Sequence, residues 1–176
     1  PIMQVRVVDP NGEPLPTGEI GEICMSGPML IRGYWHRPEA TAEAIRDGWL
    51  HTGDLGYIDD EGFVYVVDRI KDMVLRGGEN VYCSEVEAAI FEHANVHEVA
   101  VFGLPHERLG EEVACALQPV AGTTVDTTEL TQFLAERIAP FKIPTQWFVR
   151  PDPLPRGATG KILKREIRDR ILDGNY

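Results

Sequence analysis

The sequence has no long uninterrupted apolar run, and its start has no basic segment followed by an apolar one. A membrane-spanning helix needs about 20 apolar residues, and a secretory signal peptide needs both a basic and an apolar region, so neither is predicted. Cysteine is scarce: Cys24, Cys83 and Cys115 are scattered, and no CxxC pair occurs. This usage is typical of a reducing compartment and predicts a cytoplasmic location.

Several catalytic motifs are also missing. GxSxG, GxGxxG and HExxH do not occur, which argues against a serine-hydrolase elbow, a dinucleotide-binding loop and a zinc protease. Gly160-Lys161 is only part of a phosphate-binding Walker loop, because Pro155 stands where the first glycine belongs and Ile162 where Ser or Thr belongs. We predict no metal site in the chain.

Basic residues are outnumbered, since 17 Lys and Arg stand against 28 Asp and Glu, giving a net charge of −11 in 176 residues. This excess argues against nucleic acid or anionic membranes as general partners. The hydrophobic content of 43% and the length allow one or two domains with a real core. Residues 141–176 differ, with eight basic and four acidic residues. They form either a solvated basic helix or a local anion site.

The pattern of apolar residues changes near residue 70. Over residues 1–70, strand-like stretches alternate with Gly, Pro and Asp turns, which predicts a small β-barrel-like subdomain. Over residues 71–176, strand-length apolar runs alternate with helical patterns, which predicts a compact α/β domain. Ser84 with Glu87, and Asp126 three residues before Glu129, have the spacing of helix capping pairs. The predicted fold class is α+β, in two domains.

Two segments in the middle of the chain, Trp49–Asp54 and residues 68–80, have both a structural and a functional interpretation. In Trp49–Asp54, Asp54 is either a turn carboxylate or an acceptor for two adjacent hydroxyl groups, because a carboxylate has two accepting oxygens. Arg69 can form a surface ion pair with a neighbouring aspartate, which contributes little to stability. Gly77 and Gly78 form either a hairpin turn or a place where the backbone approaches a ligand closely.

Two further segments, Phe141–Pro144 and Pro155–Lys161, each contain a lysine. Lys161 is either an ordinary lysine at the start of a helix or a mobile charge for an anion. The second interpretation is favoured, because a cation at a helix start opposes the helix dipole and because glycines flank this lysine.

These four segments, in this order, resemble the AMP-forming acyl-CoA synthetases, a family of adenylate-forming enzymes that includes peptide-synthetase adenylation domains and luciferases. The resemblance covers essentially the whole chain. Trp49–Asp54 is similar to the family's W-x-x-T-G-D motif, and Asp68–Glu87 is similar to its hinge and the start of its C-terminal domain. Phe141–Pro144 and Pro155–Lys161 are similar to its last two motifs.

The family's phosphate loop and acyl pocket lie upstream of these motifs and have no counterpart here. The resemblance therefore implies the C-terminal portion of a larger enzyme, inactive by itself. Residues 1–70 would be the last β-subdomain of its N-terminal domain, and residues 71–176 its mobile C-terminal domain. The parent would be an ATP-dependent acid–thiol ligase that forms an acyl-adenylate from a carboxylic acid and transfers the acyl group to CoA. The form of the hinge hairpin implies that this acid is a fatty or an aryl acid.

The resemblance also implies the roles of individual residues. Asp54 and Arg69 would bind the ribose of ATP or AMP, and Lys161 would be the catalytic cation of adenylate formation. Lys71 would be the hinge, and Gly77-Gly78 would line the channel for CoA. Mg²⁺ is expected with ATP, held by upstream residues.

Two alternatives stay open. The acceptor thiol could be the pantetheine of a carrier protein, or the chain could be a non-catalytic binding module derived from the family. The chain could also form a homodimer, and neither nucleic acid nor a membrane is an expected partner.

Overall fold

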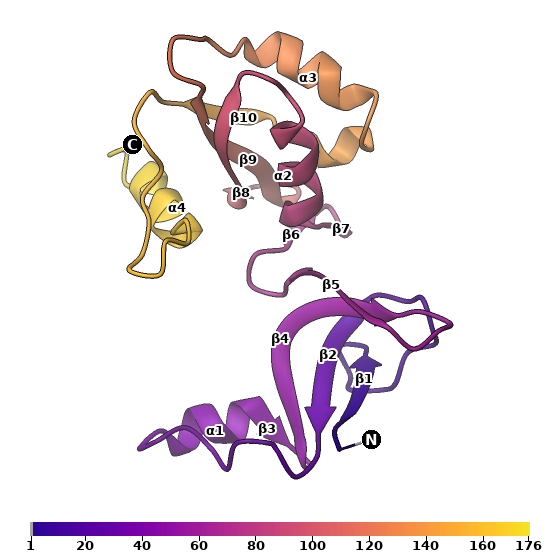
Figure 1. Cartoon of the computed structure of the whole chain (residues 1–176). Helices are drawn as coiled ribbons and strands as arrows, with labels where there is room; N and C mark the ends of the chain where they lie inside the picture. Colours follow the sequence, from indigo (N-terminus) through magenta and orange to yellow (C-terminus); the bar gives the residue numbers. More distant parts are fainter. Residues whose placement is uncertain (1) are drawn as a thin grey trace. The chain divides into compact units, whose positions relative to one another are not determined.

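The computed structural model describes residues 2–176 and divides into two units, one ending at Lys71 and one spanning Asp72–Tyr176 (Figure 1). Each unit contains a curled five-stranded sheet, and helices accompany both sheets. The predicted fold class, a mixture of α and β structure, is confirmed. None of the helices within residues 2–176 combines the length and the apolar character needed to cross a membrane.

The first unit is an antiparallel sheet with one short helix. The strands lie in the order β1-β2-β4-β3, and β5 also pairs with β4. The elements are β1 Gln4–Val8, β2 Gly21–Ser26, α1 Pro38–Ala44, β3 Ile45–Arg46, β4 Trp49–Ile58 and β5 Val64–Arg69.

Strand β4 is strongly bent (Figure 1), and along its length it pairs with β2, β3 and β5. A register shift between Leu55 and Gly56 marks an irregularity in its pairing with β5. A Cβ atom at Gly56 would lie 2.1 Å from the carbonyl oxygen of Tyr65, so only glycine allows the strands to approach this closely. The close pairing of β4 with β5 at this point therefore depends on a residue without a side chain.

The second unit has helices on both faces of its sheet. The strands lie in the order β10-β9-β6-β7, with β8 on β9, and only the β9–β10 pair is parallel. The elements are β6 Val74–Arg76, β7 Glu79–Val81, α2 Cys83–Phe91, β8 Val96–His106, β9 Gly110–Pro119, α3 Thr127–Ala135, the 3₁₀ helix η1 Pro140–Lys142, β10 Gln146–Val149 and α4 Lys164–Leu172.

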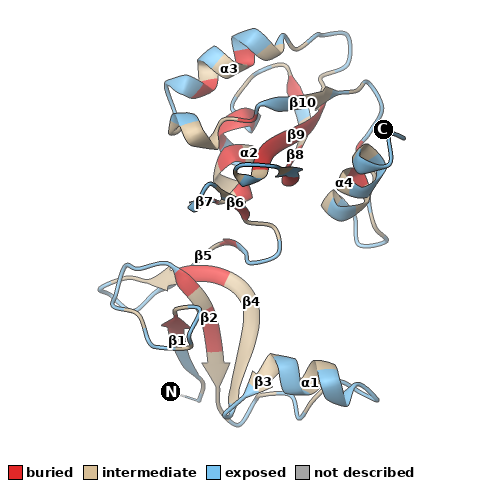
Figure 2. Ribbon diagram, turned by 180° about the vertical axis from the view of Figure 1, so that it is seen from behind, coloured by how far each residue is buried: buried red, intermediate tan, exposed pale blue. Residues whose placement is uncertain are grey.

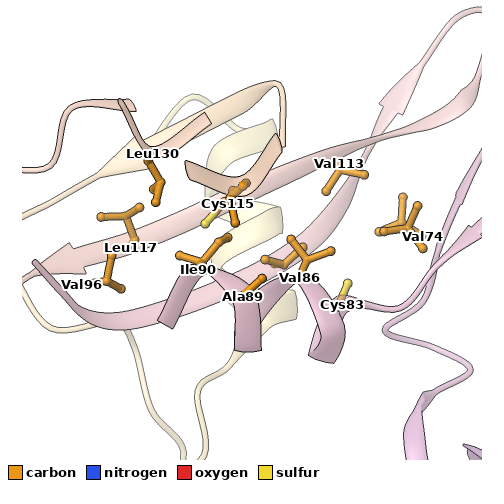
Figure 3. Packing of buried hydrophobic residues seen from close by; sticks show 13 residues of the cluster. Val74, Cys83, Val86, Ala89, Ile90, Val96, Val113, Cys115, Leu117 and Leu130 are labelled. Carbon is orange, nitrogen blue, oxygen red and sulfur yellow. The ribbon is translucent and has the colours of Figure 1, made fainter. Parts of the chain in front are cut away.

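The core of the second unit consists of two clusters on opposite faces of β8 and β9, whose residues alternate between them. Much of both strands is buried (Figure 2). In the first cluster, residues such as Cys115 and Leu117 pack against α2 and α3 (Figure 3). In the second, Ala100 and Phe102 pack with Leu154 and with Ile167 of α4. Both faces of the sheet are thus covered.

Of the two expected helix caps, one is confirmed and one is wrong. Asp126 precedes α3 and accepts a hydrogen bond from the Thr128 amide at 2.7 Å. Ser84 is not an N-cap, because α2 already begins at Cys83. Glu87, its expected partner, instead accepts a hydrogen bond from the Val101 amide at 2.7 Å, and a buried amide needs such an acceptor.

Candidate functional site

Asp54 and Arg69, the two residues expected to bind ribose, lie opposite each other on β4 and β5. Arg69 Nε is 3.3 Å from Asp54 Oδ1, and the side chains are 63% and 34% exposed. The structure therefore brings these two predicted residues together. Because both remain open to solvent, the pair can exchange its mutual contact for contacts to a ligand.

The backbone before Asp54 is held to the neighbouring strand. Thr52 Oγ1 donates to the Ile23 carbonyl at 2.7 Å and accepts from the Asp54 amide at 3.1 Å. Glu22 accepts a hydrogen bond from the Gly53 amide at 3.1 Å. Gly53 has a φ of +74°, which other residues rarely adopt. These contacts give Asp54 a fixed position on the strand.

Glu22 also takes part in a group of potential metal ligands that the sequence analysis did not identify. Among residues 2–176, Glu22, Cys24 and His51 are the one such group whose ligand atoms lie within 4.8 Å of one another. His51 Nδ1 is 2.6 Å from Glu22 Oε2 and 3.4 Å from Cys24 Sγ. Burial, together with the Glu22 carboxylate, raises the pKa of the Cys24 thiol, which disfavours the thiolate that a metal would need.

This group does not fit Mg²⁺, which prefers an octahedron of oxygen ligands over sulfur and imidazole. No magnesium chemistry is assigned to these residues. Their signal was hard to recognise because Glu22 and His51 are far apart in sequence and meet only through the pairing of β2 with β4.

Lys71, the expected hinge residue, is exposed and is the last residue of the first unit. Its position is therefore at the division between the two units. Its role as a hinge stays a prediction.

Gly77 and Gly78 form the two-residue turn between β6 and β7, with Arg76 paired to Glu79. Their φ angles are +61° and +92°, as a tight hairpin turn requires. A Cβ at Gly77 would lie 3.2 Å from Leu109 Cδ2, whereas a Cβ at Gly78 would meet nothing within 4 Å. Backbone conformation alone thus explains both glycines, and open space lies beside Gly78.

An ion pair next to the turn, formed by the half-buried Arg76 and the buried Glu112, attaches this hairpin to β9. Arg76 Nε and Nη2 donate to the two carboxylate oxygens of Glu112 at 2.6 and 3.2 Å. Burial by itself would raise the pKa of Glu112, but hydrogen bonds from Arg76 and from the Val113 amide hold that pKa below its usual value. The hairpin is therefore presented on a rigid support.

Lys161 lies in the loop between β10 and α4, far from the glycine hairpin in the sequence. It is exposed, and within residues 2–176 it forms no ion pair. By contrast, Lys142 and Lys164 each contact a glutamate at 2.7 Å, namely Glu85 and Glu87. Lys161 is thus a free cation held on a structured loop, in which the Gly157 amide donates to its carbonyl at 2.9 Å.

Comparison with known proteins gives two matching family models. Residues 1–35 match the family model of the AMP-binding enzymes, and residues 85–161 match the model of the AMP-binding enzyme C-terminal domain. Feruloyl-CoA synthase of an Amycolatopsis species is 47% identical over 95% of this chain and 34% of its own length. Fatty acid–acyl-carrier-protein ligase ScoC of Streptomyces coeruleorubidus is 43% identical over 97% of this chain and 33% of its own.

Solved structures of adenylate-forming enzymes also match the chain. ATP-bound MatB from Rhodopseudomonas palustris matches all of this chain and 35% of its own with a TM-score of 0.91 at 39% identity. Apo MatB matches with a TM-score of 0.68 at 40% identity. The chain therefore belongs to the AMP-binding, adenylate-forming enzymes, and it spans about a third of the length of the relatives it matches.

Proposed function

We propose that this chain serves as the C-terminal portion of an ATP-dependent, AMP-forming ligase that joins a carboxylic acid to the thiol of CoA. The observation that carries the proposal is Lys161, an exposed cation without an ion-pair partner among residues 2–176, on a loop whose backbone is internally bonded. The named activity of feruloyl-CoA synthase supports CoA as the acceptor, and that of ScoC supports ligation of a carboxylic acid.

In the first step, a carboxylate oxygen of the acid attacks the α-phosphorus of ATP, and the bond to the leaving pyrophosphate breaks. Asp54 accepts hydrogen bonds from the ribose hydroxyls, and Arg69 contacts the ribose beside it. Two anions must meet in this step. The ammonium group of Lys161 offsets their repulsion and stabilises the charge that develops on the phosphoryl oxygens.

In the second step, the thiol of CoA attacks the acyl carbonyl and AMP leaves. The second unit turns at Lys71, which withdraws Lys161 and brings the hairpin beside the pantetheine arm. The open space beside Gly78 is compatible with such a channel.

A carrier-protein pantetheine is the second candidate acceptor, and the similarity to ScoC favours it. Thioester formation assayed with CoA and with a pantetheine-loaded carrier protein separates the two acceptors. Feruloyl-CoA synthase supports an aryl acid and ScoC a fatty acid, so both classes belong in the substrate panel.

Mg²⁺ would be held with ATP by residues outside this chain. The three cysteines are buried and form no disulfide within residues 2–176, which supports the expected cytoplasmic location. The chain alone is expected to be inactive, and a homodimer stays a prediction.

The test uses the whole gene product that carries this sequence. Lys161→Ala should lower acyl-adenylate formation, followed as pyrophosphate exchange, by about 10²–10³-fold. Arg108→Ala, which removes another exposed cation of the second unit, should leave the rate unchanged. Full activity of Lys161→Ala, or adenylate formation by the 176-residue chain alone, would contradict the proposal.

A further inference from the structure

Glu98 lies on β8 and carries out no step of the reaction described above. Its side chain is 11% exposed, and both of its oxygens have partners. Oε2 accepts from the Leu154 amide at 2.8 Å, and Oε1 accepts from Arg156 Nη2 at 2.6 Å. Both partners belong to the segment that leads into the Lys161 loop.

An irregularity in β8 brings Glu98 to this segment. In a regular strand, residues 96, 98 and 100 would share one face. Here Val96 packs in the first core cluster and Ala100 in the second. The register with β9 shifts between Val96 and Glu98, so one extra residue reverses the alternation and places Glu98 on the face that packs against Leu154.

Arg156 extends the contact to the residue before Lys161. Its Nη1 donates to the Gly160 carbonyl at 2.5 Å while its Nη2 contacts Glu98. Gly160 has a φ of +80°, and its amide donates to the Gly157 carbonyl at 2.9 Å. We call this chain of contacts the Glu98–Arg156–Gly160 bridge. It connects β8, which pairs with β9, to the backbone next to Lys161.

We propose that Glu98 is a positioning residue for Lys161, acting through the Glu98–Arg156–Gly160 bridge. The inference rests on the proposed function, because Lys161 must be the catalytic cation for its position to matter. A long lysine side chain gains catalytic value when its backbone is held in place, since misplacement of about 1 Å can cost about 10²-fold in rate.

Burial and hydrogen bonding at Glu98 agree with this role. Burial by itself would raise the pKa of Glu98, but the bonds from Arg156 and from the Leu154 amide hold that pKa below its usual value. The carboxylate is therefore ionised at neutral pH. Glutamine cannot replace it, because one of the two donors would then face an amide NH₂ group.

The first experiment tests the bridge in the 176-residue chain, without reference to activity. Glu98→Gln should accelerate hydrogen exchange of the Gly157 and Gly160 amides about 5–30-fold. Glu92→Gln is the matched control, because it removes the carboxylate of an ion pair with Arg137, 3.3 Å apart, elsewhere in the same unit. Unchanged exchange in Glu98→Gln would overturn the inference.

The second experiment measures the two half-reactions in the whole gene product. Glu98→Gln should slow adenylate formation about 10–100-fold and leave thioester formation from supplied acyl-adenylate unchanged. Arg156→Lys should do the same, because a single ammonium cannot reach Glu98 and Gly160 as the planar guanidinium does.

The outcomes separate the two proposals. If Lys161→Ala loses adenylate formation while Glu98→Gln retains it, the positioning role is wrong and the proposed function stands. An equal loss of both half-reactions in Glu98→Gln would indicate general structural damage and also overturn the positioning role. Full activity of Lys161→Ala would overturn the proposed function and this inference together.

Discussion

The two units bury their apolar residues in different ways. The second unit has buried clusters on both faces of its sheet, joined by residues of α2, α3 and α4. The first unit buries only a few apolar residues, and Trp35, Phe63 and Val66 are each more than half exposed. Exposed apolar groups of this kind are typical of interaction surfaces. The comparison indicates that the second unit is stabilised by its own packing, whereas the first has apolar surface still available for contact.

The strongest test of this difference is a cavity in the second core. Leu130 is fully buried in α3, so Leu130→Ala should lower the free energy of unfolding of the second unit by about 2–5 kcal/mol. Val66→Ala should change the free energy of unfolding of the first unit by no more than about 0.5 kcal/mol, because Val66 is 67% exposed. Urea titrations followed by NMR signals of each unit measure both. Equal losses in the two variants would contradict the comparison.

A smaller loss of stability is expected when the ion pair between Arg76 and the buried Glu112 is broken. Glu112→Gln should cost about 1–3 kcal/mol at neutral pH, because Gln presents an NH₂ group to donors that now contact a carboxylate.

The same pair has a pH dependence. The pKa of Glu112 is lowered in the folded state, so its contribution is present above the unfolded value near 4.5 and is lost as pH falls through the lower folded value. Unfolding titrations from pH 7 to pH 3 should show a steeper loss in the wild type than in Glu112→Gln. Glu107→Gln, at an exposed position, is the control and should follow the wild type.

Replacing a turn glycine should lower the free energy of unfolding by a similar amount in both units. The two units would then differ in stability through their packing and not through their turns. Gly78 and Gly62 have φ angles of +92° and +86°, and a Cβ at either would meet nothing within 4 Å. Gly78→Ala and Gly62→Ala should therefore each cost about 1–2 kcal/mol, from backbone conformation alone. Thermal unfolding of the two variants checks this. A cost confined to one unit would show that the turns contribute to the contrast.

The smallest effect on stability is expected at Asp54 in the first unit. Its contact with Arg69 is exposed, so Asp54→Asn should change the free energy of unfolding by only about 0–1 kcal/mol. ATP binding by the whole gene product should nevertheless weaken, measured by calorimetry, if Asp54 binds the ribose. Unfolding of the first unit in this variant would show that the carboxylate is structural.

Local signals in the sequence were sufficient for several elements. The hairpin at Gly77-Gly78 and the α3 cap at Asp126 follow from residues that meet their partners within a few positions. The pairing of Asp54 with Arg69 could be expected only through the family resemblance.

Contacts between distant residues could not be predicted. Glu87 has the spacing of a capping residue, yet it contacts Val101 and Lys164, which only the folded sheet and α4 bring near it. The position of Glu98 depends on one extra residue in β8, whose effect appears only in the register with β9. Tertiary contacts thus overrode the local pattern at these positions.

The second core cluster also has a consequence for synthesis. Phe102 and Leu104 are translated well before Ile167, the residue of α4 that covers them. During elongation, this face of the sheet stays open to solvent and to other nascent chains until the last helix has left the ribosome. Nascent chains that stall within α4 should therefore present an aggregation-prone face of the sheet.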